Sequence, residues 1–369
     1  MNRSVIFLIV AFIGRSSIAA PEDIGALLTP ISERRAVPGL AAAAIRDGTI
    51  IAAGVTGVRA LGSSEKIALD DKWHIGSCTK SMTASLAAIL VEEGKLTWDA
   101  TVEASLPSLR TGMRPGWQKV TLEQLLRHRA GAPGEAPGDL WRAAGNASGA
   151  PRQQRVNFVR GLLARDPEAE PGSKFVYSNQ GYAIAGAMIE HQLNKGWEEL
   201  MQQRLFAPLG MKSAGFGPPG SATRVDQPRG HRRQYNETKP VPPGKDADNP
   251  AAIGPAGTVH CSIEDFARYA GWHALGESES PRLLSKASFE KLHTAKEGED
   301  YAMGWGVTKR GWAGGTALSH SGSNTMWFAV MWVAPAKQAA FVAATNIAGD
   351  DAAKACDDAV AALIQRFLK

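Results

Sequence analysis

The segment around which this chain is organised is Trp73-His74-Ile75-Gly76-Ser77-Cys78-Thr79-Lys80. Behind it, apolar residues recur at the spacing of a helix, which predicts a buried helix over residues 79 to 93 that Gly94 ends. Ser77 opens this helix, and Lys80 lies three residues further on, which places both side chains on one face. The dipole of a helix N-terminus favours negative charge that develops on a nucleophile at this place.

A lysine that has lost its proton can activate a neighbouring serine as a nucleophile. The Ser-x-x-Lys pattern is weak by itself because the chain holds it three times, at Ser63 to Lys66, at Ser77 to Lys80 and at Ser288 to Lys291. The first lies in a polar stretch and the third in the middle of a helix without a catalytic partner. Context therefore favours Ser77.

Apolar runs on both sides of this segment predict antiparallel strands. Residues 39 to 46 and 49 to 58 are joined by Asp47-Gly48, which is a strong hairpin signal. Residues 326 to 333 and 339 to 345 form a second pair, and residues 301 to 308 could add a fifth strand. Residues 350 to 368 show helical spacing, so we expect a C-terminal helix that packs on the sheet.

Residues between these strands have helical patterns, at 121 to 128, 152 to 165, 181 to 193 and 197 to 205. We therefore expect a discontinuous antiparallel α/β domain, residues 20–75 and 215–369, with a mostly helical domain, residues 76–214, inserted into it. The proline-rich residues 217 to 255 predict a long loop. Within it, Arg229 to Arg233 is most simply a solvated loop, with an acidic substrate or cell-wall polymer as the alternative ligand.

The composition excludes several classes of protein. Of 369 residues, 44% are apolar and 21% charged, which argues against a disordered chain, a coiled coil and a polytopic membrane protein. The net charge of +5 is not gathered into long basic runs, so nucleic acid is a poor candidate partner. Cys78, Cys261 and Cys356 are scattered and form no metal-binding pair, so we expect neither a disulfide framework nor a metal site.

The first residues have the layout of a secretory signal peptide. Arg3 precedes the apolar run 5 to 13, and small residues end at Ala19-Ala20. The apolar run is about half the length that a membrane-spanning helix needs. We expect residues 1–19 to be removed, leaving a periplasmic or secreted protein without a transmembrane anchor.

Two motifs further along complete a set with Ser77-Cys78-Thr79-Lys80: Tyr177-Ser178-Asn179 and His320-Ser321-Gly322. With these three motifs the chain resembles the serine β-lactamase-related hydrolases, the family of class C β-lactamases, D-alanyl-D-alanine peptidases and related esterases. The resemblance covers residues 25 to 365. It implies a β-lactamase/transpeptidase-like α/β (α+β) fold, with an antiparallel sheet flanked by helices and an inserted mostly helical domain.

The resemblance also implies the roles of the site residues. Ser77 would be the acylated nucleophile, and Lys80 and Tyr177 would share the work of the general base, with either one able to take the serine proton. Asn179 would hold the substrate amide. The backbone N–H groups of Ser77 and Ser323 would bind the oxyanion, with Gly322 permitting close approach of the acyl group.

The sequence departs from the family in two places. β-Lactamases of the family usually carry lysine where this chain has His320, and histidine, with a reference pKa of about 6.5, is a weaker cation at neutral pH. This favours the peptidase and esterase branches. Met326 and Trp327 stand where many relatives have a glycine, and we expect them to narrow the acyl pocket.

Two other residues near the motifs have simpler interpretations. Cys78 follows the nucleophile directly, but one residue along a helix is about 100° of rotation, so we expect a buried side chain rather than a second nucleophile. We expect His128 to be a structural hydrogen-bonding residue.

These observations lead to one functional hypothesis with two alternatives. We predict an exported serine hydrolase that forms an acyl-enzyme at Ser77 and hydrolyses an ester or amide, as an esterase or D-amino-acid peptidase does, without a cofactor or metal. The alternatives are a class C-like β-lactamase and a penicillin-binding protein that is acylated but does not turn over. The expected partner is a small-molecule or peptide ester or amide, with a cell-wall peptide as one candidate, and not nucleic acid.

Overall fold

The structure is a computed structural model that describes residues 20–235, 237–276 and 283–368. The expected signal peptide, residues 1–19, lies outside the described residues. None of the described helices is long and apolar enough to cross a bilayer.

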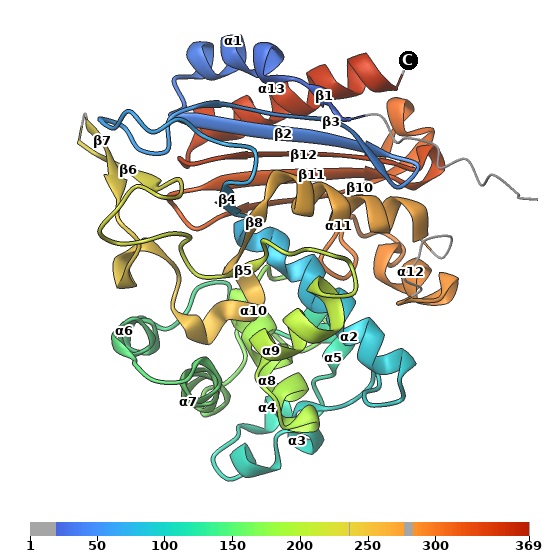
Figure 1. The fold of residues 1–369 in the computed structure, drawn as a ribbon. Helices are drawn as coiled ribbons and strands as arrows, with labels where there is room; N and C mark the ends of the chain where they lie inside the picture. The colour runs from blue at the N-terminus through green and yellow to red at the C-terminus, as the bar shows by residue number, and fades with distance from the viewer. Residues whose placement is uncertain (1–19, 236, 277–282, 369) are drawn as a thin grey trace, which may run out of the picture.

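A seven-stranded sheet forms the upper layer of the molecule in Figure 1. Its order is β1-β3-β2-β12-β11-β10-β9; β1 runs parallel to β3 and all other neighbours are antiparallel. The strands span Glu22–Asp23 (β1), Gly39–Arg46 (β2), Thr49–Gly57 (β3), Gly306–Arg310 (β9), Gly315–Ser323 (β10), Phe328–Ala334 (β11) and Ala339–Thr345 (β12).

The expected hairpins are confirmed. Asp47 and Gly48, at φ 50° and 74°, turn the chain from β2 to β3 in the left-handed conformation that tight hairpins require. The second pair, β11 and β12, is joined through Pro335–Lys337. The fifth strand begins later than expected, since β9 starts at Gly306 and Tyr301 makes only an isolated bridge to that residue.

Small residues in the central strands let helices approach both faces of the sheet. Ala42 and Ala44 of β2 face helices α1 (Gly25–Arg35) and α13 (Asp350–Phe367), and Ala41 and Ala43 face the other side, where α11 (Ile263–Leu275) packs. This alternation is what the pleat of a strand imposes. The expected C-terminal helix is confirmed as α13, with Cys356 and Leu363 in its buried stripe.

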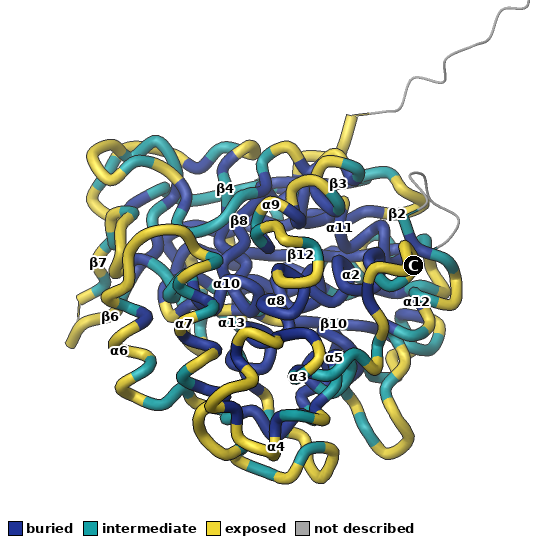
Figure 2. The backbone as a smooth tube through the Cα atoms, turned by 90° about the horizontal axis from the view of Figure 1, so that it is seen from below, coloured by how far each residue is buried: buried dark blue, intermediate teal, exposed yellow. Residues whose placement is uncertain are grey.

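The helices between the strands lie below the sheet in Figure 1. Figure 2 shows α2, α8 and α10 as the buried centre of this part, with exposed segments around them. The helices span Thr79–Glu92 (α2), Val102–Ser105 (α3), Pro115–Gln118 (α4), Leu122–Leu126 (α5), Gly138–Asn146 (α6), Pro151–Leu163 (α7), Asn179–Leu193 (α8), Trp197–Met201 (α9), Gly254–Gly257 (α10) and Lys286–His293 (α12).

Two small sheets are separate from the large sheet. One has the order β4-β8-β5, formed by Lys72–His74, Val259–Ser262 and Gly215–Phe216. The other pairs β6 (Gly230–Gln234) with β7 (Glu237–Val241). Although Arg233 is exposed, the interpretation of residues 229 to 233 as a solvated loop is therefore wrong for β6, a strand whose Gly230 and His231 are buried. Its His231 is fully buried, with Nδ1 2.7 Å from the Asn346 carbonyl oxygen and Nε2 accepting a hydrogen bond from the Leu61 N–H.

Candidate active site

Residues 75–78, called the nucleophile segment here because Ser77 is the expected nucleophile, join strand β4 to helix α2. After His74, a single turn of 3₁₀ helix over Gly76–Cys78 leads into α2 at Thr79. Gly76 has φ 49°, a left-handed conformation that glycine adopts without cost. Ser77 is thereby placed at the entrance to a helix of which twelve residues, from Thr79 to Leu90, are buried.

Lys80 is the most deeply buried charged group beside Ser77. Its side chain is 0% exposed, and Nζ lies 3.0 Å from Ser77 Oγ, 2.6 Å from Asn179 Oδ1 and 2.9 Å from the Ala256 carbonyl oxygen. Burial removes water from the ammonium group and lowers the pKa of Lys80 to about 7. At neutral pH this amine exists in both charged and neutral forms.

Tyr177 lies over Lys80 at the open side of the site. The lysine Nζ is 4.7 Å from the centroid of the tyrosine ring, and the residue as a whole is 39% exposed. Burial around the hydroxyl raises the pKa of Tyr177, and a hydrogen bond with Ser77 only partly offsets this effect. The phenol is therefore a proton donor rather than a ready base at neutral pH.

Asn179 begins helix α8, one residue after the N-cap Ser178. The Ser178 hydroxyl accepts a hydrogen bond from the Gly181 N–H and donates one to the Pro133 carbonyl oxygen, which fixes the start of the helix. The Asn179 amide oxygen is thus held against Lys80.

Strand β10 brings the third motif against the segment that holds Ser77. A Cβ on Gly322 would lie 2.4 Å from the Ser77 nitrogen, closer than real contacts allow. The absence of a side chain at Gly322 therefore lets the backbone of β10 approach the backbone of the nucleophile segment. The sequence had suggested that Gly322 makes room for the acyl group of a substrate, whereas the structure shows that it makes room for protein backbone. Ser323 follows it as the last residue of the strand.

His320 is buried, and its ring is engaged within the protein. Nδ1 lies 2.6 Å from the Ser321 carbonyl oxygen and Nε2 lies 3.1 Å from the Tyr301 hydroxyl, so Nδ1–H donates and Nε2 accepts. Burial, followed by the charge of Lys80, lowers the pKa of His320 to about 3. A neutral imidazole supplies no fixed positive charge for a substrate carboxylate at neutral pH.

Two contributors to the site were not identified from sequence. Tyr301 bonds with His320, and the Ala256 carbonyl oxygen accepts from Lys80. His128 packs its ring 4.5 Å from that of Tyr177, and its Nδ1 accepts from the Ser178 N–H, which agrees with a structural role. In the sequence Tyr301 appeared only as the first residue of an expected strand, and a backbone carbonyl such as that of Ala256 carries no residue-type signal.

The bulky pair after the third motif is buried. Met326 and Trp327 are each 2% exposed, and the Trp327 ring packs against that of Trp73 at 6.1 Å. Cys78 is also buried, with Sγ 3.4 Å from the His320 carbonyl oxygen, and burial raises the pKa of its thiol. Within the described residues, no group of three or more His, Cys, Asp or Glu side chains is placed to hold a metal ion.

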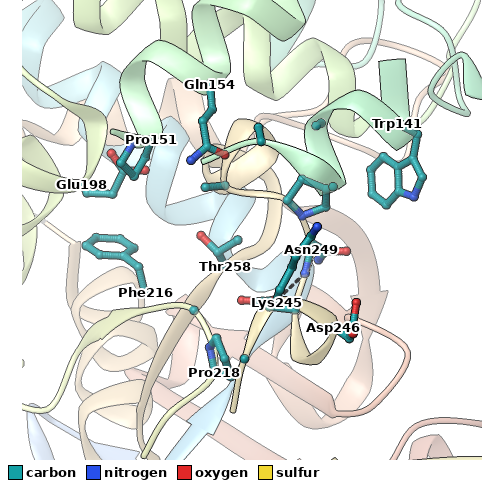
Figure 3. A pocket seen from close by; sticks show the side chains of 18 of the residues that line it. Trp141, Pro151, Gln154, Glu198, Phe216, Pro218, Lys245, Asp246, Asn249 and Thr258 are labelled. Atoms are coloured by element: carbon teal, nitrogen blue, oxygen red, sulfur yellow. Dashed lines mark hydrogen bonds between the residues drawn. The ribbon is translucent and has the colours of Figure 1, made fainter. Parts of the chain in front are cut away.

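Figure 3 shows a cavity, which has a volume of about 710 Å³. Helices α6 and α7 contribute Trp141, Pro151 and Gln154 to its wall, and the segment before α10 contributes Lys245 and Asn249. The Asn249 amide donates to the Gly257 carbonyl oxygen, and a Cβ on Gly257 would lie 3.6 Å from the carbonyl carbon of Gly76. One stretch of backbone thus separates this cavity from the residue before Ser77.

The chain has similar proteins among characterised sequences and solved structures. Penicillin-binding protein 4 of Amycolatopsis lactamdurans is 28% identical, over 84% of this chain and 81% of that protein. Unguisins hydrolase ungD of Aspergillus violaceofuscus is also 28% identical, over 66% of this chain but only 43% of that longer protein. The octameric penicillin-binding protein homologue from Pyrococcus abyssi superposes with a TM-score of 0.74 at 25% identity, over 92% of this chain and 76% of that one.

These relatives include hydrolases and penicillin-binding proteins, and the fold is the β-lactamase/transpeptidase fold. The family model described as Beta-lactamase matches residues 24–365. The chain belongs to the β-lactamase family.

Proposed function

We propose that this protein is an exported serine hydrolase that forms an acyl-enzyme at Ser77 and hydrolyses an ester or amide, as esterases and D-amino-acid peptidases do. The observation that carries the proposal is the position of Lys80, fully buried and 3.0 Å from Ser77 Oγ. Burial of an ammonium group costs free energy, and a buried lysine with a lowered pKa is typical of a functional site at which the amine loses its proton.

The hydrogen bonds of Lys80 favour it over Tyr177 as the general base. A neutral amine has two N–H bonds, which Asn179 Oδ1 and the Ala256 carbonyl oxygen accept, and one lone pair, which is left for the Ser77 hydroxyl. The lowered pKa of Lys80, about 7, makes this form available at neutral pH, whereas the raised pKa of Tyr177 keeps the phenol protonated.

The reaction then follows from the geometry. The Ser77 proton moves to Lys80 Nζ as Oγ bonds to the substrate carbonyl carbon, and the N–H groups of Ser77 and Ser323 bind the oxyanion. The tetrahedral intermediate expels an alcohol or amine, which takes the proton from Lys80, with the Tyr177 hydroxyl placed to donate a hydrogen bond to the leaving group. Water then cleaves the acyl-enzyme, releases the acid and restores the serine hydroxyl.

The test combines turnover with covalent labelling. We expect hydrolysis of 4-nitrophenyl butyrate by the wild type and loss of at least 10³-fold in kcat for Ser77→Ala, with the thermal unfolding temperature unchanged within a few degrees. Ser63→Ala is the matched control, since Ser63 and Lys66 repeat the Ser-x-x-Lys spacing away from the site. Full turnover by Ser77→Ala would defeat the proposal.

A second candidate function has support from the relative named penicillin-binding protein. In that case fluorescent penicillin would label Ser77 and remain attached, and mass spectrometry of the intact protein would show the adduct persisting for hours. Rapid hydrolysis of a chromogenic cephalosporin would instead indicate a β-lactamase. The neutral state of His320 favours the esterase or peptidase activity over that last outcome.

A further inference from the structure

One carboxylate oxygen connects three segments beside the site. Asp248 Oδ1 lies 2.8 Å from His74 Nε2 and accepts hydrogen bonds from Asn324 Nδ2 at 3.1 Å and from the Asn249 N–H at 2.7 Å. All three side chains that meet here are buried, with exposed fractions of 0% for His74, 6% for the Asp248 side chain and 4% for Asn324. Burial of a carboxylate costs free energy, so packing alone does not explain why Asp248 stands at this position.

The first arm of this cluster reaches the nucleophile. His74 ends strand β4, and its Nδ1 accepts a hydrogen bond from the Gly76 N–H at 3.2 Å. Since Nδ1 is an acceptor, the ring carries a proton on Nε2, which faces Asp248. The contact with Asp248 is short but poorly aligned for a hydrogen bond, so its attraction is mainly electrostatic. Gly76, the residue that the ring orients, directly precedes the N–H of Ser77.

The second arm reaches the end of strand β10. Asn324 follows Ser323, and its side chain accepts from the Met326 N–H at 3.2 Å while it donates to Asp248. Between them Thr325 has φ 74°, a left-handed conformation that a β-branched residue rarely adopts. The Asn324 side chain, anchored on Asp248, thus holds a strained turn that would otherwise relax and move Ser323.

We propose that Asp248 is a positioning residue that sets the spacing between the backbone N–H groups of Ser77 and Ser323 through His74 and Asn324. The inference rests on the proposed function, because it concerns the two groups that would bind the oxyanion. Asp248 acts through its neighbours and touches neither Ser77 nor Lys80 in any described contact. Its place in the wall of the adjoining cavity connects that wall to the oxyanion site.

The experiment separates positioning from stability by comparing a tetrahedral adduct with a substrate. Wild type, Asp248→Asn, His74→Gln, His74→Asn and Asn324→Ala are assayed for kcat and KM on 4-nitrophenyl butyrate and for inhibition by phenylboronic acid, whose adduct with Ser77 resembles the oxyanion. His74→Asn retains an acceptor for the Gly76 N–H, and His74→Gln retains a donor toward Asp248, so the pair distinguishes the two ends of the ring.

We expect Asp248→Asn and Asn324→Ala to lower kcat and the affinity for phenylboronic acid together, by about 10- to 100-fold, with KM changed less than threefold. His260→Asn is the control, because His260 pairs with His74 in register on β8 but bonds with the Gly217 carbonyl oxygen. This variant should lose thermal stability while it retains kcat and boronate affinity.

Variants at Asp248 and Asn324 that unfold at lower temperature but keep wild-type kcat and boronate affinity would overturn the inference. So would equal losses in His260→Asn and Asp248→Asn. If Asp248→Asn does not fold, the two His74 variants and Asn324→Ala decide the question by the same readouts. A Ser77→Ala protein that still turns over would instead defeat the proposed function, and this outcome is independent of Asp248.

Discussion

Gly76 and Gly322 face each other where the nucleophile segment meets strand β10. A Cβ on Gly76 would lie 2.4 Å from the Ser323 nitrogen, and a Cβ on Gly322 would lie 2.4 Å from the Ser77 nitrogen. Each glycine thus makes room for the N–H group that follows the other. The two backbone segments can approach this closely only because neither residue has a side chain, and the proposed oxyanion site depends on that approach.

Gly322→Ala should therefore inactivate the protein. The added methyl group would also lie 2.1 Å from the Ile75 carbonyl oxygen, so the strand must move away from Ser77. We expect kcat on 4-nitrophenyl butyrate to fall at least 100-fold, as measured by absorbance. Gly311→Ala is the control, because nothing lies within 4 Å of a Cβ built there. Equal activity of the two variants would contradict the role assigned to Gly322.

Lys80 predicts the acid limb of the pH–rate profile. Its pKa is lowered to about 7, and only the neutral amine accepts the serine proton, so kcat/KM should rise with pH through an apparent pKa near 7 and fall below it. Lys80→Arg cannot lose its proton and should lose at least 10²-fold in kcat/KM without a limb in this range. If the Lys80→Arg variant still shows an acid limb near pH 7, the limb arises from the titration of a group other than Lys80.

The neutral state of His320 predicts how the protein treats anionic substrates. Since burial lowers the pKa of His320 to about 3, acidification from pH 8 to pH 5.5 should not create a carboxylate-binding cation. The ratio of kcat/KM for 4-nitrophenyl hemisuccinate to that for 4-nitrophenyl butyrate should stay constant within about twofold, because protonation of Lys80 affects both esters. A tenfold rise in this ratio that His320→Gln abolishes would show a charged imidazole.

Buried histidines predict sensitivity to mild acid. Burial lowers the pKa of six histidines, namely His128, His231, His260, His273, His293 and His320. Below pH 6.5 the unfolded chain binds protons that the folded chain does not, so the free energy of unfolding falls as the pH falls, by up to about 1.4 kcal/mol per pH unit for each histidine. Urea unfolding between pH 7.5 and 5 measures this slope.

Removal of one such histidine gives the control for this prediction. His231→Asn lowers stability at pH 7.5 but should make the dependence on pH shallower, since one proton fewer is taken up on unfolding. A free energy of unfolding that does not change between pH 7.5 and 5 would show that these rings are protonated in the folded protein.

The cysteines predict resistance to thiol reagents. Cys78, Cys261 and Cys356 are all free and buried, and burial raises the pKa of each thiol. Iodoacetamide at pH 8 should leave both the intact mass and the turnover of the folded protein unchanged, whereas the urea-unfolded chain should gain three adducts. Rapid loss of activity with one adduct on the folded protein would show that Cys78 is accessible.

Short-range sequence patterns correctly predicted those strands and helices that depend on neighbouring residues. The Asp47-Gly48 turn and the spacing of apolar residues in α13 depend on neighbours a few residues away, and the strands and helix that they predict are present. Arg229 to Arg233 misled because its charges suggested solvent, while β6 is held by partners as distant as Asn346. Burial in this short strand decreases from Gly230 to Gln234 without alternating, so a period-two pattern could not reveal those partners.

The same distinction holds for the site. Ser77 and Lys80 are three positions apart in the sequence, so one helical turn brings them together. Asp248 lies 174 positions after His74 (248 − 74) in a proline-rich stretch, and its contact with His74 follows only from the complete tertiary structure. The lowered pKa of His320 could not be predicted from the sequence either, because it depends on the burial of the ring in the folded protein, where Nε2 contacts the Tyr301 hydroxyl.

The order of strands in the large sheet has a consequence for how the protein is made. Leu40 of β2 pairs with Thr345 of β12, 305 positions later (345 − 40), and this seam runs through the middle of the sheet. During folding, the free edge of the first hairpin cannot find its partner until almost all the remaining residues are available. Release of a chain that stops before β12 would leave that alanine-rich edge unpaired, so premature termination should yield aggregates and not a smaller working hydrolase.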